Sequence, residues 1–163
     1  MRLNVEAVKP LLEHIRPLLE QLNDTLASPG QAPEDDEMMA EFWHTDLINS
    51  QRADVAALVA LFDGTFLETG RTVIFMDKAD LLVRACTVIR LKLRETSLGE
   101  IGDEALESGE FEFEDLGFDA RMGYGAYMLF ASLQEMIIAQ IDKEAGEGDD
   151  DDEEEDDEYG SGR

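Results

Sequence analysis

The sequence has one cysteine, two histidines and four prolines among its 163 residues. The single cysteine, Cys86, excludes an intramolecular disulfide, and its place in an apolar helical pattern predicts a small buried side chain rather than a nucleophile. Apolar runs are also short, and none approaches the roughly 20 residues that cross a bilayer. Residues 1–6 lack the apolar centre of a signal peptide. We therefore expect a cytoplasmic protein that does not associate with membranes.

The shortage of histidine and cysteine argues against a metal site. Glu41 and His44 have the Glu-x-x-His spacing of di-iron helical bundles, but such a site needs a second pair and two further glutamates on facing helices. The other histidine, His14, has no glutamate three residues before it. A structural zinc site takes four ligands, chiefly cysteine and histidine. We expect no metal and no cofactor, and we expect His14 to be a solvated surface residue.

Motifs of catalysis and of phosphate binding are missing too. The sequence has neither a Gly-x-Ser-x-Gly elbow nor a Gly-x-x-x-x-Gly-Lys loop. Gly99 and Gly102 lack the preceding strand and the third glycine of a dinucleotide-binding fingerprint. The sequence therefore identifies no catalytic residue, and we expect that the protein is not an enzyme.

Basic residues are few, since 13 Lys and Arg stand against 39 Asp and Glu, for a net charge of −26. Twelve of the acids and one base fall in residues 144–163, which leaves −15 on residues 1–143. A protein of this charge repels nucleic acid and anionic membranes, so we expect neither as a partner. Residues 146–163 form an acidic tail that we expect to be disordered. Its role is open among a solubility device, a lure for a basic partner and a mimic of nucleic-acid charge.

Helical patterns are what the sequence has in abundance. The clearest covers Lys78 to Arg94, and it also holds five of the thirteen cations. Its apolar stripe, at alternating steps of three and four residues, consists of Ala79, Leu82, Cys86, Ile89 and Leu93. We expect Asp77 to cap this helix and the rest of the bundle to close around it.

Three further helices are predicted over residues 8–26, 45–62 and 120–143. Pro17 should kink the first, Thr45 or Asp46 should cap the second, and Gly123 and Gly125 should weaken the third or let it pack closely.

Residues between these helices have mixed character. Thr65 to Met76 has strand character, either as a hairpin or paired with Arg2–Val5. Residues 110–114 alternate as E-F-E-F-E, which fits an edge strand or a loop pinned by Phe111 and Phe113. The predicted fold is mainly α: one bundle of four to five helices over residues 1–145, with a minor β element near Thr72–Met76.

Two groups of residues are candidates for function. Arg90 and Glu135 each lie among apolar residues, so they should pair as a staple between two helices, or line a pocket together with Trp43. The second group is an apolar patch that would serve as an interaction surface or a homodimer contact. It consists of Met38, Met39, Phe42 and Trp43.

Short motifs in residues 1–143 resemble a bacterial family known as domain of unknown function 2017. An acidic stretch leads to a Glu-Phe motif at Ala40-Glu41-Phe42, a Leu-Arg-Leu core is matched by Ile89-Arg90-Leu91, and Leu133-Gln134-Glu135 matches the last helix. The resemblance implies a small helical protein of the cytoplasm, with a regulatory link to Clp-type proteolysis because family members are often encoded beside the adaptor of the Clp protease. It implies no catalytic residue.

These observations favour a non-enzymatic interaction or regulatory protein whose protein partner is unknown. The alternative is a helical domain that binds a small ligand, or acts on one, in a pocket near Trp43, Arg90 and Glu135.

Overall fold

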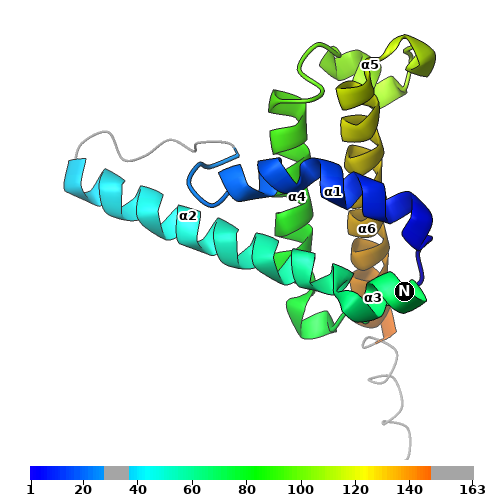
Figure 1. Cartoon of the computed structure of the whole chain (residues 1–163). Coiled ribbons are helices and arrows are strands. Elements are labelled where there is room, and N and C mark those ends of the chain that lie inside the picture. The colour runs from blue at the N-terminus through cyan, green and yellow to red at the C-terminus, as the bar shows by residue number, and fades with distance from the viewer. Residues whose placement is uncertain (28–36, 148–163) are drawn as a thin grey trace, which may run out of the picture.

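Helix α4 (Ala79–Glu95) lies at the centre of the fold. The computed structural model describes residues 1–27 and 37–147. Figure 1 shows α4 beside α6 (Phe118–Glu147), with α1 (Val5–Gln21) crossing in front of both. The mainly helical bundle predicted from the sequence is confirmed.

The apolar stripe of α4 is buried as its spacing predicts. All five side chains are at most 2% exposed: Ala79, Leu82, Cys86, Ile89 and Leu93. The predicted cap is wrong, however. Asp77 belongs to a 3₁₀ turn, η2 (Met76–Lys78), that runs directly into α4, and no side chain caps the helix. The turn makes a cap unnecessary because the first helical N–H, that of Ala79, bonds to the Met76 carbonyl.

Helix α6 packs closely on its neighbours at two of its glycines. A Cβ at Gly123 would lie 2.5 Å from Cβ of Ser97, and one at Gly125 would lie 2.8 Å from Cδ2 of Leu11. The close-packing interpretation of these glycines is therefore the correct one. The helix also extends beyond the predicted residues 120–143 at both ends.

Helix α2 (Glu37–Val59) is continuous, so the break predicted at residues 44–46 is wrong. Thr45 and Asp46 are exposed helical residues. Neither costs more than about 0.7 kcal/mol in a helix, which is too little to end one. The C-terminal half of α2 packs on α4 and continues into a 3₁₀ turn, η1 (Ala60–Phe62).

The β element predicted near Thr72–Met76 is wrong. Residues 64–69 form a short helix, α3 (Gly64–Thr69), and residues 72–75 form no strand. In the described residues, β pairing amounts to one antiparallel bridge between Arg2 and Arg71. A hairpin therefore does not form, and the alternative pairing with Arg2–Val5 is reduced to that bridge.

The segment between α4 and α6 has no strand within its described residues. It holds the short helix α5 (Asp103–Ser108) and a 3₁₀ turn, η3 (Phe113–Asp115). The Phe111 ring stands edge-on to the Tyr124 ring of α6, with their centroids 5.0 Å apart. Of the two predicted alternatives for residues 110–114, the loop pinned by phenylalanine is the correct one.

The predicted tail, residues 146–163, lies almost wholly outside the described residues, which end at Glu147. Gly146 and Glu147 belong to α6, so the helix reaches into the segment that we assigned to the tail. Among the described helices, none is both long enough and apolar enough to cross a membrane.

Candidate functional site

Arg90 joins α4 to α6 through its guanidinium group. Its Nη1 donates to Oε1 of Gln134 at 2.7 Å, and its Nη2 donates to the hydroxyl of Tyr127 at 2.8 Å. The guanidinium carbon also lies 4.5 Å from the centre of the Tyr127 ring, within cation–π range. Arg90 is therefore a staple between helices, as predicted, but its partners differ from the predicted one.

Glu135 does not pair with Arg90, because its side chain is exposed on the outside of α6. The neighbouring Gln134 takes the place predicted for it. Successive helical residues point about 100° apart, so a shift of one position decides which of the two faces α4. The side-chain amide of Gln134 also donates to Oγ1 of Thr87 at 2.8 Å. Gln134 therefore uses both its donor and its acceptor to bind residues of α4.

Stapling leaves one atom of Arg90 without a partner. Its Nε is buried and makes no hydrogen bond among the described residues. No carboxylate of residues 1–27 or 37–147 forms an ion pair with this arginine, so the face of the Tyr127 ring and two neutral oxygens stabilise it. The cluster holds α4 and α6 together.

Cys86 lies on the same helix, one turn before Arg90, and is completely buried. Burial raises the pKa of its thiol to about 12, although the charge of Arg90 lowers it in part. The thiol is therefore protonated at neutral pH. This setting agrees with the predicted inert side chain and not with a nucleophile.

The raised pKa of Cys86 should make the protein lose stability in alkali. Below about pH 8 the thiol is protonated in both states, and as the pH rises toward 12 the unfolded chain ionises first. Between pH 7 and pH 10.5 we expect an extra loss of about 1–2 kcal/mol in the free energy of unfolding, compared with Cys86→Ala. Urea titrations of both proteins at both pH values measure it. Equal losses in the two proteins would contradict the shift.

A second polar contact, between α2 and α4, was not predicted. Asp54 is buried and accepts two hydrogen bonds from Arg84, from Nε at 2.8 Å and from Nη2 at 3.0 Å. These bonds hold the pKa of Arg84 above its ordinary value. Gln51, also buried, donates to the Leu22 carbonyl and so anchors the segment after α1. The sequence could have indicated Gln51 and Asp54, because both residues lie on the buried stripe of α2, in line with Leu58.

The predicted apolar patch lies on the α2 arm, the name used here for residues 37–50. Figure 1 shows this half of α2 projecting away from α4 and α6. No side chain described from Met39 to Ser50 is buried. Phe42 is 71% exposed and Met39 54% exposed, while Trp43 is partly covered. The side chain of Met38 lies outside the described part of the structure.

The pocket predicted near Trp43, Arg90 and Glu135 does not form. Trp43 belongs to the projecting α2 arm, Arg90 is engaged with α6, and Glu135 faces away from that contact. The three residues therefore stand in separate surroundings.

Neither histidine belongs to a group of side chains that could bind a metal ion in the described part of the structure. Across residues 1–27 and 37–147, no three His, Cys, Asp or Glu side chains are grouped closely enough to hold an ion. His14 is not the solvated residue we predicted. Its side chain is 19% exposed, its Nε2 lies 3.1 Å from Oδ1 of Asp119, and its ring stands edge-on to Phe118.

Comparison with models of protein families, with curated proteins and with solved structures finds no match for this chain. The resemblance to domain of unknown function 2017 therefore stays a prediction from sequence motifs.

Proposed function

We propose that this protein is a non-enzymatic interaction module that binds another protein through the α2 arm. The observation that carries the proposal is the exposed state of the arm, in which no described side chain from Met39 to Ser50 is buried. An isolated helix of about this length is marginal in water. A partner that covers the arm would bury its apolar side chains and so stabilise it.

The chemistry of the arm indicates what kind of surface would accept it. Residues 37–50 carry three acids, Glu37, Glu41 and Asp46, and no lysine or arginine. The apolar residues of the same segment are Met38, Met39, Phe42, Trp43, Leu47 and Ile48. An apolar groove with a basic rim matches both features, in the manner of helix-in-groove recognition.

A second copy of the chain fits this description poorly. Each copy carries a net charge of −26, so two arms or two bodies in contact would repel each other. We therefore favour a different protein with a basic binding face over the homodimer that the apolar patch also suggested. The motif resemblance would connect this partner with Clp-type proteolysis in the cytoplasm.

Site-specific crosslinking tests the proposal. A photo-reactive phenylalanine analogue is placed at Phe42 in the full chain, and in a control protein at Phe118. The two positions are matched, since both are phenylalanines of similar exposure, 71% and 69%, and Phe118 lies at the start of a different helix. We expect position 42 to capture a protein from the native cytosol that position 118 does not, and Trp43→Ser to reduce its yield at least several-fold.

Two results would overturn the proposal. Equal crosslinking from both positions would mean that the arm has no special partner. A product that contains two copies of this chain, together with a dimer in light scattering that Phe42→Ser dissociates, would make the arm a homodimer contact. A captured component of Clp-type proteolysis would support the motif resemblance, and a partner of another kind would contradict it.

A further inference from the structure

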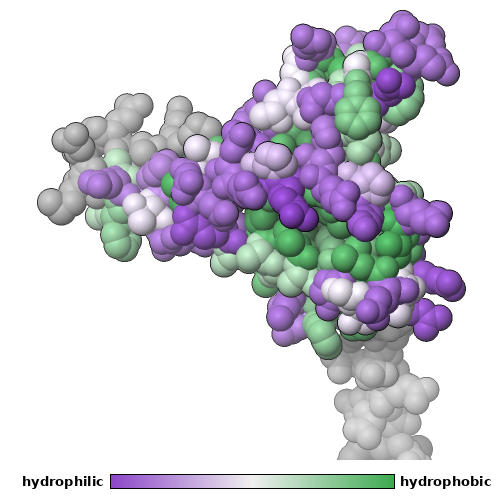
Figure 2. All heavy atoms as spheres, viewed as in Figure 1, coloured by the Kyte–Doolittle hydropathy of each residue, from purple (hydrophilic) through white to green (hydrophobic). Residues whose placement is uncertain are grey.

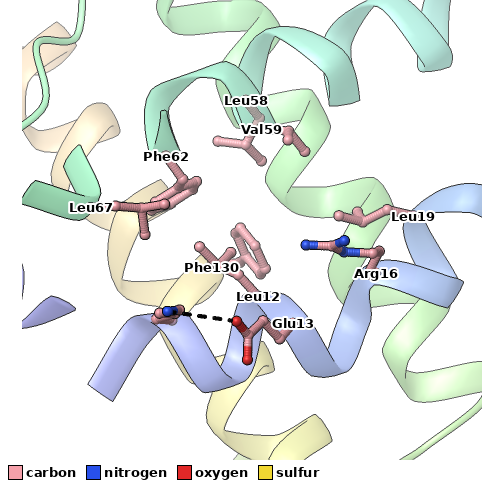
Figure 3. Close-up of a pocket in the computed structure, with 10 residues that line it drawn as sticks. Leu12, Glu13, Arg16, Leu19, Leu58, Val59, Phe62, Leu67 and Phe130 are labelled. Atoms are coloured by element: carbon pink, nitrogen blue, oxygen red, sulfur yellow. Dashed lines mark ion pairs between the residues drawn. The ribbon is translucent and has the colours of Figure 1, made fainter. Parts of the chain in front are cut away.

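A hollow of about 330 Å³ opens between α1, the end of α2, η1, α3 and α6 (Figure 3). Its lining is apolar except at the rim. The apolar residues are Leu12, Leu19, Leu58, Val59, Phe62, Leu67 and Phe130. Figure 2 shows the corresponding patch of hydrophobic side chains below α1, in the space between α1 and α3.

The floor of this hollow belongs to the hydrophobic core. Leu58 and Phe130 are at most 1% exposed and Phe62 is 9% exposed, and all three line the hollow. The hollow therefore ends at the closed surface of the core, and its more exposed apolar walls are Val59 and Leu67. None of the seven apolar lining side chains offers a hydrogen bond, so whatever fills the interior must be apolar.

The polar rim comes from one face of α1. Lys9, Glu13 and Arg16 follow each other at steps of four and three residues, and together they carry a net charge of +1. Lys9 and Glu13 form a long, exposed ion pair of 3.9 Å. Arg16 makes no hydrogen bond or ion pair with any described residue, and Figure 3 shows its guanidinium group pointing across the hollow toward Phe130.

We propose that this hollow binds a monocarboxylate with a linear apolar chain of about eight to ten carbons, and that Arg16 holds its carboxylate. At about 30 Å³ for each non-hydrogen atom, the hollow holds on the order of ten such atoms. An unpaired guanidinium group is the side chain best suited to bind a carboxylate by two parallel hydrogen bonds. This site is independent of the partner proposed for the α2 arm.

Charge complementarity is the reason for choosing an anion. In a chain with a net charge of −26, the rim of this hollow nevertheless carries a net positive charge over an apolar interior. Glu13 stands beside it, which disfavours a dianion such as a phosphate monoester and leaves a single negative charge as the best match. An apolar side chain of a partner protein would fill the interior but would leave Arg16 without a counter-charge.

Decanoate is the probe for this site, with the full-length protein as the receptor. Titration calorimetry should give one binding site, and amide resonances around the hollow should shift on its addition. Decyltrimethylammonium has the same chain with the opposite charge, and butyrate has the same head group with a short chain. We expect each of them to bind at least about tenfold more weakly than decanoate.

Two variants and one matched control assign the contacts. Arg16→Gln should weaken decanoate binding about tenfold, which is the usual effect of losing one charge-assisted hydrogen bond. Arg121→Gln removes an exposed arginine that does not line the hollow and should bind like the parent protein. Leu67→Trp places a larger side chain at the mouth and should abolish binding, with circular dichroism to show that the fold is kept.

The proposal is wrong if decanoate at millimolar concentration leaves the resonances around the hollow unchanged, which is the result expected when only a partner protein fills it. It is also wrong if the cationic probe binds as tightly as decanoate, or if Arg16→Gln binds decanoate like the parent protein.

Discussion

Phe66→Ala should lower the free energy of unfolding by about 3–5 kcal/mol, as large truncations in a core do. Phe66 is completely buried, although it belongs to α3, a helix of only six residues. Its ring stands edge-on to Phe62 with centroids 5.2 Å apart, and Phe62 stands edge-on to Phe130 at 6.4 Å. The truncation would leave a cavity beneath this row of three rings.

Urea titration of the purified protein measures this loss, with Phe75→Ala as the control. Phe75 is 62% exposed and lies in the extended segment that follows α3, so its truncation should change stability by about 0.5 kcal/mol or less. If Phe66→Ala costs less than about 1 kcal/mol, α3 does not anchor the core as the structure places it.

The same phenylalanine shows why the sequence predicted a strand here. Phe66 favours extended backbone, as do residues 72–75, but that preference is weak and depends on context. Hydrogen bonding decides in favour of a helix. Oδ1 of Asp63 accepts from the Phe66 N–H at 2.9 Å, which caps α3, and Gly70 ends it with a φ of +67°. Asp63 directly follows the helix predicted over residues 45–62, and its side chain starts the next helix.

The sequence predicted well those structural features that depend on one helix alone. The stripe of α4 is buried as its spacing requires, because a long helix with one continuous apolar face has only one way to bury it. The patch containing Phe42 and Trp43 was also identified as exposed apolar surface. The position of that patch relative to the bundle depends on the length of α2. Because the sequence predicted a break at residues 44–46, it did not predict that the patch projects on a continuous helix.

Features that depend on several helices could not be predicted. The hollow beside Arg16 exists because α1, α6 and the continuous segment from the end of α2 through η1 to α3 meet there. These three parts are far apart in the sequence. No local pattern around Arg16 distinguishes it from any other surface arginine. The partner of Arg90 could not be predicted for the same reason. The rotation of α6 about its own axis decides which residue faces Arg90, and that rotation is set by the contacts of α6 with two other helices.

Arg90→Ala should lower the free energy of unfolding by about 2–3 kcal/mol. It removes two hydrogen bonds and a cation–π contact, and it leaves Oε1 of Gln134 and the buried hydroxyl of Tyr127 without their donors. Arg90→Met should cost less, because methionine keeps aliphatic contacts that alanine loses. Both variants remove the charge and the unpaired Nε, and both leave the same two oxygens without donors.

Glu135→Ala is the matched control for the stapling of α4 to α6, because Glu135 is adjacent to Gln134 but exposed. We expect it to change stability by about 0.5 kcal/mol or less. A double-mutant cycle of Arg90→Ala with Gln134→Ala should give a coupling energy of about 1 kcal/mol, and the cycle with Glu135→Ala should give none. A cycle in which Glu135 couples and Gln134 does not would restore the ion pair predicted from the sequence, and α6 would then have to be rotated by about one residue relative to α4.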